Sequence, residues 1–201
     1  MTLPQYRRIN SQPKSTYLFL MNFFQFIFQD WKVNTGNTKG RLILLLFRIS
    51  NFSTTDRFYY YLFFPYRIVY KIIVQGLFVI EIPWNVHIGK NLRLFHGQAL
   101  VIHNRVMMGE NCTLRHCTTI GNKEFRDGSS STSPVIGNNV DVGSNVCIVG
   151  GIVIGDNVKI GCGAVVTRSI SGDCIAVGNP AIEKRKMGGL ADPINSPNIK
   201  I

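Results

Sequence analysis

Apolar residues recur at every sixth position in the second half of the chain. Six is a multiple of the strand period of two, whereas an α-helix repeats near 3.6. Two residues of each six face inward, which predicts short strands with a corner in every unit, the pattern of a parallel β-helix. Glycine, which permits tight turns, follows the inner residue in several units. The two inward series read Ile136, Val142, Ile148, Ile154, Ile160, Val166 and, two residues earlier, Pro134, Val140, Val146, Ile152, Val158, Ala164.

The same repeat runs earlier in the chain, from Val86/Ile88 to Thr118/Ile120, with two interruptions. A two-residue insertion containing His96-Gly97 follows Leu94, and a polar segment from 121 to 133 separates the two halves of the repeat. Six faces on either side of this segment predict about four three-sided coils. A β-sandwich of short strands would need hairpin turn signals, and these are absent.

Apolar, aromatic-rich segments before the repeat predict helices at 15–33, 39–50 and 56–80, the last one kinked or broken at Pro65. We expect these helices to pack on one another and to cap the open end of the solenoid. An alternative is a surface that contacts a membrane, with Arg and Lys toward lipid headgroups. The apolar runs are too short to cross a bilayer.

The sequence therefore divides into a helical region at 1–82, a β-helix at 83–182 and a basic tail at 183–201. The class is mainly β, with an N-terminal α-helical segment.

A net charge of +11 favours polyanionic partners, such as an acidic polysaccharide, an anionic lipid or a phosphorylated cofactor. No nucleic-acid-binding motif is visible, so no nucleic acid is expected. None of the five cysteines lies in a CxxC pair and no signal peptide precedes them, which fits a reducing cytoplasm. No two histidines have the spacing of metal ligands on a helix, so we expect no catalytic metal.

Three stretches resemble the hexapeptide-repeat acyltransferases: Glu81-Ile82-Pro83, the segment LFHGQALVIHNRVMMGENCTLRHCTTIGNK at 94–123, and GNPA at 178–181. Within that superfamily the chain looks like the serine acetyltransferase branch, and in particular like colanic-acid and capsular-polysaccharide O-acetyltransferases. The resemblance implies a left-handed parallel β-helix, acetyl-CoA as co-substrate and a homotrimer with its sites between subunits.

The resemblance also implies the catalytic residues. His96 matches the general base, a role that suits an imidazole near neutral pKa beside a reacting hydroxyl. Glu81 matches the acidic residue that orients this base, where the serine enzymes have an aspartate. Backbone N–H groups near Gly121 and Asn122 would hold the thioester oxygen as it gains negative charge.

Coenzyme A would lie along small residues of the later coils, with basic residues near its phosphates. The residues so implied are Gly143, Ser144, Gly161, Gly163, Ala164, Lys184 and Arg185.

The acceptor is indicated by departures from the serine enzymes. Phe95 stands where those enzymes have an aspartate for the amino group of serine, and Thr132-Ser133 replaces an Arg-His pair. An amino-acid acceptor would lose the partners of both charges, each worth about 1.5–3 kcal/mol. Phe95 offers an apolar face to a sugar ring, and His116 could contact the acceptor or serve as a second-choice base.

The sequence thus predicts a cytoplasmic acetyl-CoA-dependent O-acetyltransferase, with contact to the inner face of the membrane left open. It would transfer acetyl directly to a sugar hydroxyl in capsule or exopolysaccharide biosynthesis. Serine O-acetyltransferase of cysteine biosynthesis is the first alternative, and a non-catalytic β-helix scaffold is the second.

Overall fold

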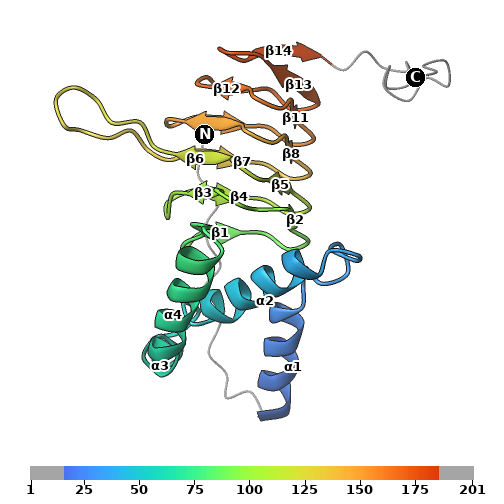
Figure 1. Cartoon of the computed structure of the whole chain (residues 1–201), viewed down its shortest axis with the longest axis vertical. Coiled ribbons are helices and arrows are strands. Elements are labelled where there is room, and N and C mark those ends of the chain that lie inside the picture. The colour runs from blue at the N-terminus through green and yellow to red at the C-terminus, as the bar shows by residue number, and fades with distance from the viewer. Residues whose placement is uncertain (1–15, 186–201) are drawn as a thin grey trace.

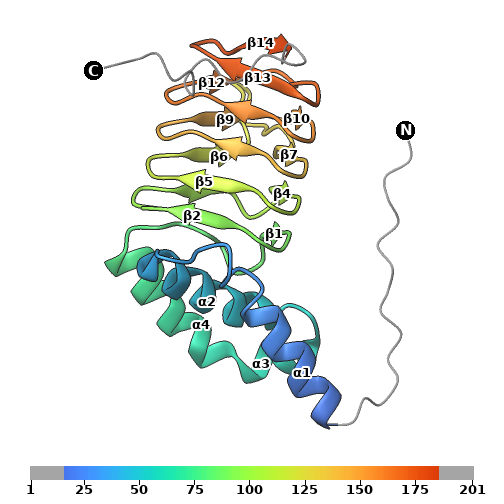
Figure 2. The ribbon, with the colours of Figure 1, turned by 90° about the vertical axis from the view of Figure 1, so that its right-hand side faces the viewer.

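The computed structural model describes residues 16–185, which form a solenoid stacked on a layer of helices (Figure 1). The helices lie below the first coil, and the chain then climbs coil by coil to β14 at the far end (Figures 1 and 2). In the described part of the chain, no helix is both long enough and apolar enough to span a membrane.

The helical layer has five elements, most of them short. Phe63 interrupts the helix of the third segment, two residues before Pro65, so the expected break is observed. Asn37 and Asp56 cap the second and third helices with their side chains, which accept from the N–H groups of Gly40 and Phe58. The elements are α1 (Thr16–Ile27), α2 (Thr38–Phe52), α3 (Arg57–Leu62), α4 (Phe64–Tyr70) and the π-helix η1 (Lys71–Leu77).

Among residues 16–185, fourteen short strands form three sheets, which are the three walls of the solenoid. The first coil contains β1 (His87–Ile88), β2 (Arg93–Phe95) and β3 (Val101–Ile102). The later strands are β4 (Met107–Met108), β5 (Thr113–Arg115), β6 (Thr119–Gly121), β7 (Val135–Ile136), β8 (Asp141–Val142), β9 (Cys147–Val149), β10 (Val153–Ile154), β11 (Lys159–Ile160), β12 (Val165–Val166), β13 (Cys174–Val177) and β14 (Ile182–Arg185).

Equivalent strands of successive coils pair in parallel, giving the orders β1-β4-β7-β10, β3-β6-β9-β12 and β2-β5-β8-β11-β13. The last of these sheets ends with β14, which pairs antiparallel with β13. Four complete coils result, which confirms the predicted parallel β-helix of about four coils. The insertion is also where it was predicted. Leu94 pairs with Leu114, twenty positions on, whereas Ile102 pairs with Ile120, eighteen positions on.

The inward series fill the interior as expected, with side chains between 0% and 8% exposed. Glycines at the corner after β1 and its equivalents have a different role from the one predicted. A Cβ on Gly109 would lie 2.8 Å from the carbonyl carbon of Gly137, so glycine is needed there for close approach of the coils. The residue with positive φ at this corner is an asparagine, for example Asn111 at 59° and Asn157 at 60°.

Polar side chains from the helical layer close the open edge of the first coil. Asp30 accepts from the N–H of Leu92 at 2.8 Å, and Asn34 both donates to the carbonyl of Leu92 and accepts from the N–H of Leu94. Asn37 donates to the carbonyl of Leu94 at 2.6 Å. These side chains replace a neighbouring strand, so β2 has no free edge.

A buried ion pair anchors the same junction. Arg48 is 1% exposed and donates to Asp30 at 2.7 Å and to the carbonyls of Ile88 and Gly89. At the opposite end of the solenoid, β14 pairs antiparallel with β13 and covers the last coil. Both edges are therefore protected.

Candidate active site

His96 occupies the corner that the two-residue insertion creates between β2 and β3. Its φ is 65° and that of Gly97 is 73°, so the corner takes a left-handed path that displaces the chain from the regular coil. The side chain of His96 is exposed. It lines a cavity of about 340 Å³ with Thr35, Gly36, Asn37, Lys39 and Phe95.

His116 lies at the equivalent corner one coil further on. The two imidazole rings are 5.7 Å apart between centroids and meet edge to face at 78°. His116 is half-buried, and among the described residues its Nδ1 has no hydrogen-bond partner. The structure therefore brings His96 and His116 together at one edge of the solenoid.

Phe95 is the last residue of β2 and is 37% exposed, so its ring can meet a ligand. The guanidinium of Arg115, which pairs with Phe95 in the sheet, lies 5.7 Å from the centre of this ring. Arg115 is held by the carboxylate of Asp141 and by the carbonyl of Val142 at 2.7 Å. No acidic side chain occupies the place of the serine enzymes' aspartate.

The small residues implied for coenzyme A lie at the corners of the next two coils that are equivalent to the corner of His116. The N–H groups of Gly143 and Gly161 donate to the next coil, and that of Gly163 donates to the carbonyl of Ser144 in the preceding coil. These N–H groups are therefore engaged, so the three glycines would offer a ligand their carbonyl groups and the space left by a missing side chain. The side chain of Ala164 is buried in the core, which leaves only its backbone for a surface site. This burial agrees with the inward position that the six-residue repeat gives to Ala164.

An exposed thiol and two basic side chains also lie in this part of the solenoid. The exposed Cys162 accepts hydrogen bonds from the side chain and backbone of Ser144, and these lower the pKa of its thiol. Lys184 and Arg185 are exposed on β14, beside β13 at the end of the same sheet.

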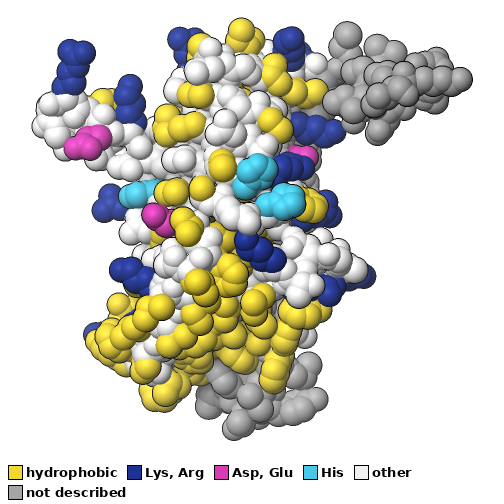
Figure 3. All heavy atoms as spheres, viewed as in Figure 1, with side chains coloured by type: hydrophobic (Ala, Val, Ile, Leu, Met, Phe, Trp, Pro, Cys, Tyr) yellow, Lys and Arg dark blue, Asp and Glu magenta, His cyan; other side chains and the backbone are white. Residues whose placement is uncertain are grey.

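Three other predicted residues lie around a second, larger cavity of about 630 Å³ on the outer side of β3 and β6. Its lining includes the expected Glu81, Gly121 and Asn122, together with Lys71, Gln75, Trp84, Asn85, His103 and Asn104. Histidine side chains are visible at two separate places on this face of the solenoid, one at its left edge and the other right of its middle (Figure 3).

Glu81 pairs with Val101 as the first residue of the β3 sheet, where its N–H donates to the carbonyl of Leu100 at 2.8 Å. Within residues 16–185 its carboxylate makes no hydrogen bond or ion pair. A single chain therefore does not form the predicted contact between Glu81 and His96.

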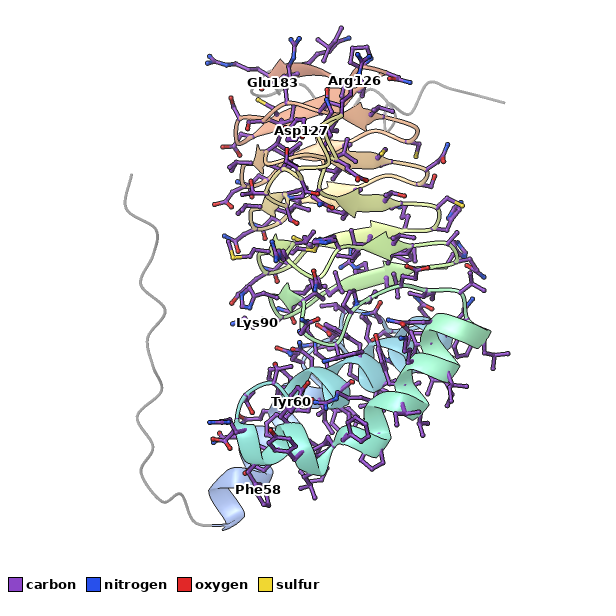
Figure 4. All side chains as sticks on the ribbon, turned by 90° about the vertical axis from the view of Figure 1, so that its left-hand side faces the viewer. Phe58, Tyr60, Lys90, Arg126, Asp127 and Glu183 are labelled. Carbon is purple, nitrogen blue, oxygen red and sulfur yellow. The ribbon has the colours of Figure 1, made fainter. Side chains whose placement is uncertain are left out.

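Gly121 ends β6, and residues 122–133 then form a loop that projects from the solenoid (Figure 1). Arg126 and Asp127 lie in this projecting loop (Figure 4). Ser133, at the end of the loop, lies with its Oγ 2.8 Å from Nδ1 of His103. Its hydroxyl is thus engaged by His103, a pairing across thirty positions that the sequence did not indicate.

In the described ranges, no cluster of three or more His, Cys, Asp or Glu side chains could hold a metal ion.

No protein-family model matches the chain. It is 33% identical over 157 residues to the candidate colanic acid biosynthesis acetyltransferase WcaB of Escherichia coli K12, covering 76% of this chain and 95% of that protein. It is also 33% identical over 138 residues to serine acetyltransferase of Helicobacter pylori strain 26695, covering 69% and 77%.

Solved structures agree on the fold. Serine acetyltransferase (CysE) of Neisseria gonorrhoeae matches with a TM-score of 0.65 and 23% identity, over 82% of this chain and 68% of that one. Serine acetyltransferase of Brucella abortus in complex with coenzyme A matches with a TM-score of 0.66 and 20% identity, over 84% and 70%.

The chain belongs to the hexapeptide-repeat acyltransferases of the serine acetyltransferase-like branch. It is an acyltransferase, and acetyl-CoA is the co-substrate that its acetyltransferase relatives imply.

Proposed function

We propose that this enzyme transfers acetyl from acetyl-CoA to a hydroxyl group of a sugar during polysaccharide assembly. The observation that carries the proposal is the exposed His96 beside the exposed ring of Phe95, at a corner that has no carboxylate for an amino group. WcaB, whose name assigns it to colanic acid biosynthesis, supports the same acceptor class.

In the proposed reaction, His96 accepts the proton of the acceptor hydroxyl as its oxygen attacks the thioester carbonyl. The carbon–sulfur bond then breaks, and the leaving thiolate of coenzyme A regains a proton from the imidazolium. Backbone N–H groups at Gly121 and Asn122 would stabilise the oxyanion. Coenzyme A would lie along Gly143, Ser144, Gly161, Gly163 and the backbone of Ala164, with its phosphates toward Lys184 and Arg185.

The site would be completed by a second copy of the chain in a homotrimer. His96 lines one cavity, whereas Glu81, Gly121 and Asn122 line another, so one chain alone does not assemble the predicted groups. Light scattering should give the mass of three chains, and a monomer that retains full activity would contradict a shared site.

Serine O-acetyltransferase is the second candidate, because serine acetyltransferases match the chain at the same 33% identity. Against it stand Phe95 and the Thr132-Ser133 pair, which offer no charged partner for serine.

The test measures free thiol released from acetyl-CoA with O-deacetylated colanic acid oligosaccharides, with L-serine, and with no acceptor. We expect turnover of the oligosaccharides well above that of serine. Serine turnover at an equal or higher rate would defeat the proposed acceptor. No turnover with any acceptor, together with a His96→Ala variant indistinguishable from wild type, would favour a scaffold.

A membrane contact is also proposed, at the inner leaflet, because acetyl-CoA is made in the cytoplasm. An apolar surface covers the helical layer (Figure 3), and Phe58 and Tyr60 lie on this part of the molecule (Figure 4). Tyr61, Ile72 and Leu77 are 70%, 64% and 74% exposed, and no acidic residue occurs between 57 and 80.

The protein should therefore sediment with vesicles containing phosphatidylglycerol, and a Tyr61→Glu/Ile72→Glu variant should not. Failure of the wild type to sediment, or a face covered by further copies of the chain in solution, would overturn this contact.

A further inference from the structure

The larger cavity holds more than the predicted oxyanion and orienting residues. It lies at the junction of the helical layer and the first two coils, where η1 contributes Lys71 and Gln75 and the entry to the solenoid contributes Trp84 and Asn85. His103 and Asn104 line it from the corner after β3. Its volume of about 630 Å³ falls within the usual range of small-molecule sites.

From this arrangement we infer that the cavity is the binding groove for the acceptor glycan, with a sugar ring stacked on Trp84. The inference rests on the proposed function and assigns its acceptor to a defined surface. The groove is called the Trp84 groove below and comprises Lys71, Gln75, Glu81, Pro83, Trp84, Asn85, Val101, Ile102, His103, Asn104, Thr119, Ile120, Gly121 and Asn122.

Contacts with Asn51 and Arg67 fix the position of Trp84. Trp84 is half-buried against the core, and its backbone carbonyl accepts from Nδ2 of Asn51 at 2.6 Å. The guanidinium of the buried Arg67 lies 5.7 Å from the indole ring. A rigid aromatic surface of this kind binds the apolar face of a pyranose with little loss of conformational entropy.

Four residues with side-chain amides line the same cavity: Gln75, Asn85, Asn104 and Asn122. Within residues 16–185 none of these amides makes a hydrogen bond to another residue. Each offers donors and an acceptor in one plane, which suits neighbouring hydroxyl groups of a sugar. The remaining charges of the groove are Lys71, which pairs with no carboxylate among the described residues, and Glu81.

The composition of the groove favours a glycan over coenzyme A. The three phosphate groups of coenzyme A would require a cluster of cations. The charges of Lys71 and Glu81 offset each other, so the groove is nearly neutral. A single apolar surface in a cavity lined by uncharged amides fits a hydroxyl-rich ligand.

Tryptophan fluorescence tests this assignment, because the chain has only two tryptophans, Trp31 and Trp84. Trp31 lies outside the groove, beside Arg41. In a Trp31→Phe variant the emission comes from Trp84 alone, and titration with O-deacetylated colanic acid oligosaccharide should give a saturable change. The matched Trp84→Phe variant, which keeps Trp31, should show no change.

Kinetics give the second readout. Trp84→Leu should raise KM for the oligosaccharide about three- to ten-fold, with KM for acetyl-CoA and kcat unchanged. Asn104→Ala, at an exposed corner where alanine is compatible with the fold, should also raise KM for the oligosaccharide and leave the melting temperature unchanged.

Failure of this inference is distinguishable from failure of the proposed function. If the wild type acetylates the oligosaccharide but neither the emission of Trp84 nor these KM values respond, the groove assignment is wrong and the proposed function stands. If the oligosaccharide is not acetylated and does not perturb Trp84, both are wrong. A rise in KM for acetyl-CoA instead would assign the groove to the donor.

Discussion

Replacing Asn34 with alanine tests how the helical layer closes the solenoid. Asn34 is 2% exposed, and its amide satisfies the carbonyl of Leu92 at 2.8 Å and the N–H of Leu94 at 3.1 Å. Asn34→Ala leaves both backbone groups buried without a partner. Each such group costs about 1–3 kcal/mol. Because the edge can relax and admit water, we expect the free energy of unfolding to fall by about 2–4 kcal/mol.

Two measurements check this expectation. Thermal unfolding followed by circular dichroism should show a melting temperature lower by roughly 4–16 °C, at about 2–4 °C per kcal/mol. Hydrogen exchange should show lost protection at the amide of Leu94, whereas that of Leu92, which donates to Asp30, should keep most of its protection.

Asn22→Ala is the matched control, because Asn22 is exposed on α1. This substitution should change stability by less than about 0.5 kcal/mol. A loss below about 0.5 kcal/mol for Asn34→Ala as well would refute the idea that these side chains stand in for a missing strand.

The remaining predictions concern buried charge and a reactive thiol. Arg48→Met should destabilise the protein by about 3–5 kcal/mol because it leaves the buried carboxylate of Asp30 without its partner. Adding Asp30→Asn should restore part of this loss. Equal stability of the single and the double variant would contradict the pairing. Hydrogen bonds from Ser144 lower the pKa of the Cys162 thiol, whereas burial raises that of Cys112 to about 11. Since the thiolate is the reactive form, alkylation of Cys162 should rise at lower pH than that of an ordinary thiol near 8.5, and Ser144→Ala should move it upward. Peptide mapping by mass spectrometry checks this, and acetyl-CoA should protect Cys162; an unchanged alkylation midpoint in Ser144→Ala would contradict the role of that hydroxyl.

The coils were predictable because each depends on residues close in sequence. Ile136, Val142 and Ile148 occupy equivalent inward positions, so a six-residue period is sufficient to identify them. The closure by Asp30 and Asn34 was not predictable in detail. These residues act on strands about sixty positions later, and polar residues in a turn region have no period that marks such a partner.

The candidate site also combines features that the repeat predicts with features that depend on distant contacts. His96 and His116 meet because both occupy one corner of successive coils, which the insertion and the repeat together indicate. Trp84 and His103 were not recognised as neighbours of Glu81. Their proximity depends on where η1 and the entry to the first coil place their side chains, and no local pattern encodes that arrangement.

The central claim to test is that His96 is the base in acetyl transfer to a glycan hydroxyl. Transfer from isotope-labelled acetyl-CoA to the oligosaccharide, quantified by mass spectrometry, should fall about 10²–10⁴-fold in a folded His96→Ala variant. A His87→Ala variant is the control, since His87 lies on a different wall of the solenoid, and it should retain the wild-type rate. Transfer by His96→Ala within a few-fold of the wild-type rate would contradict the central claim.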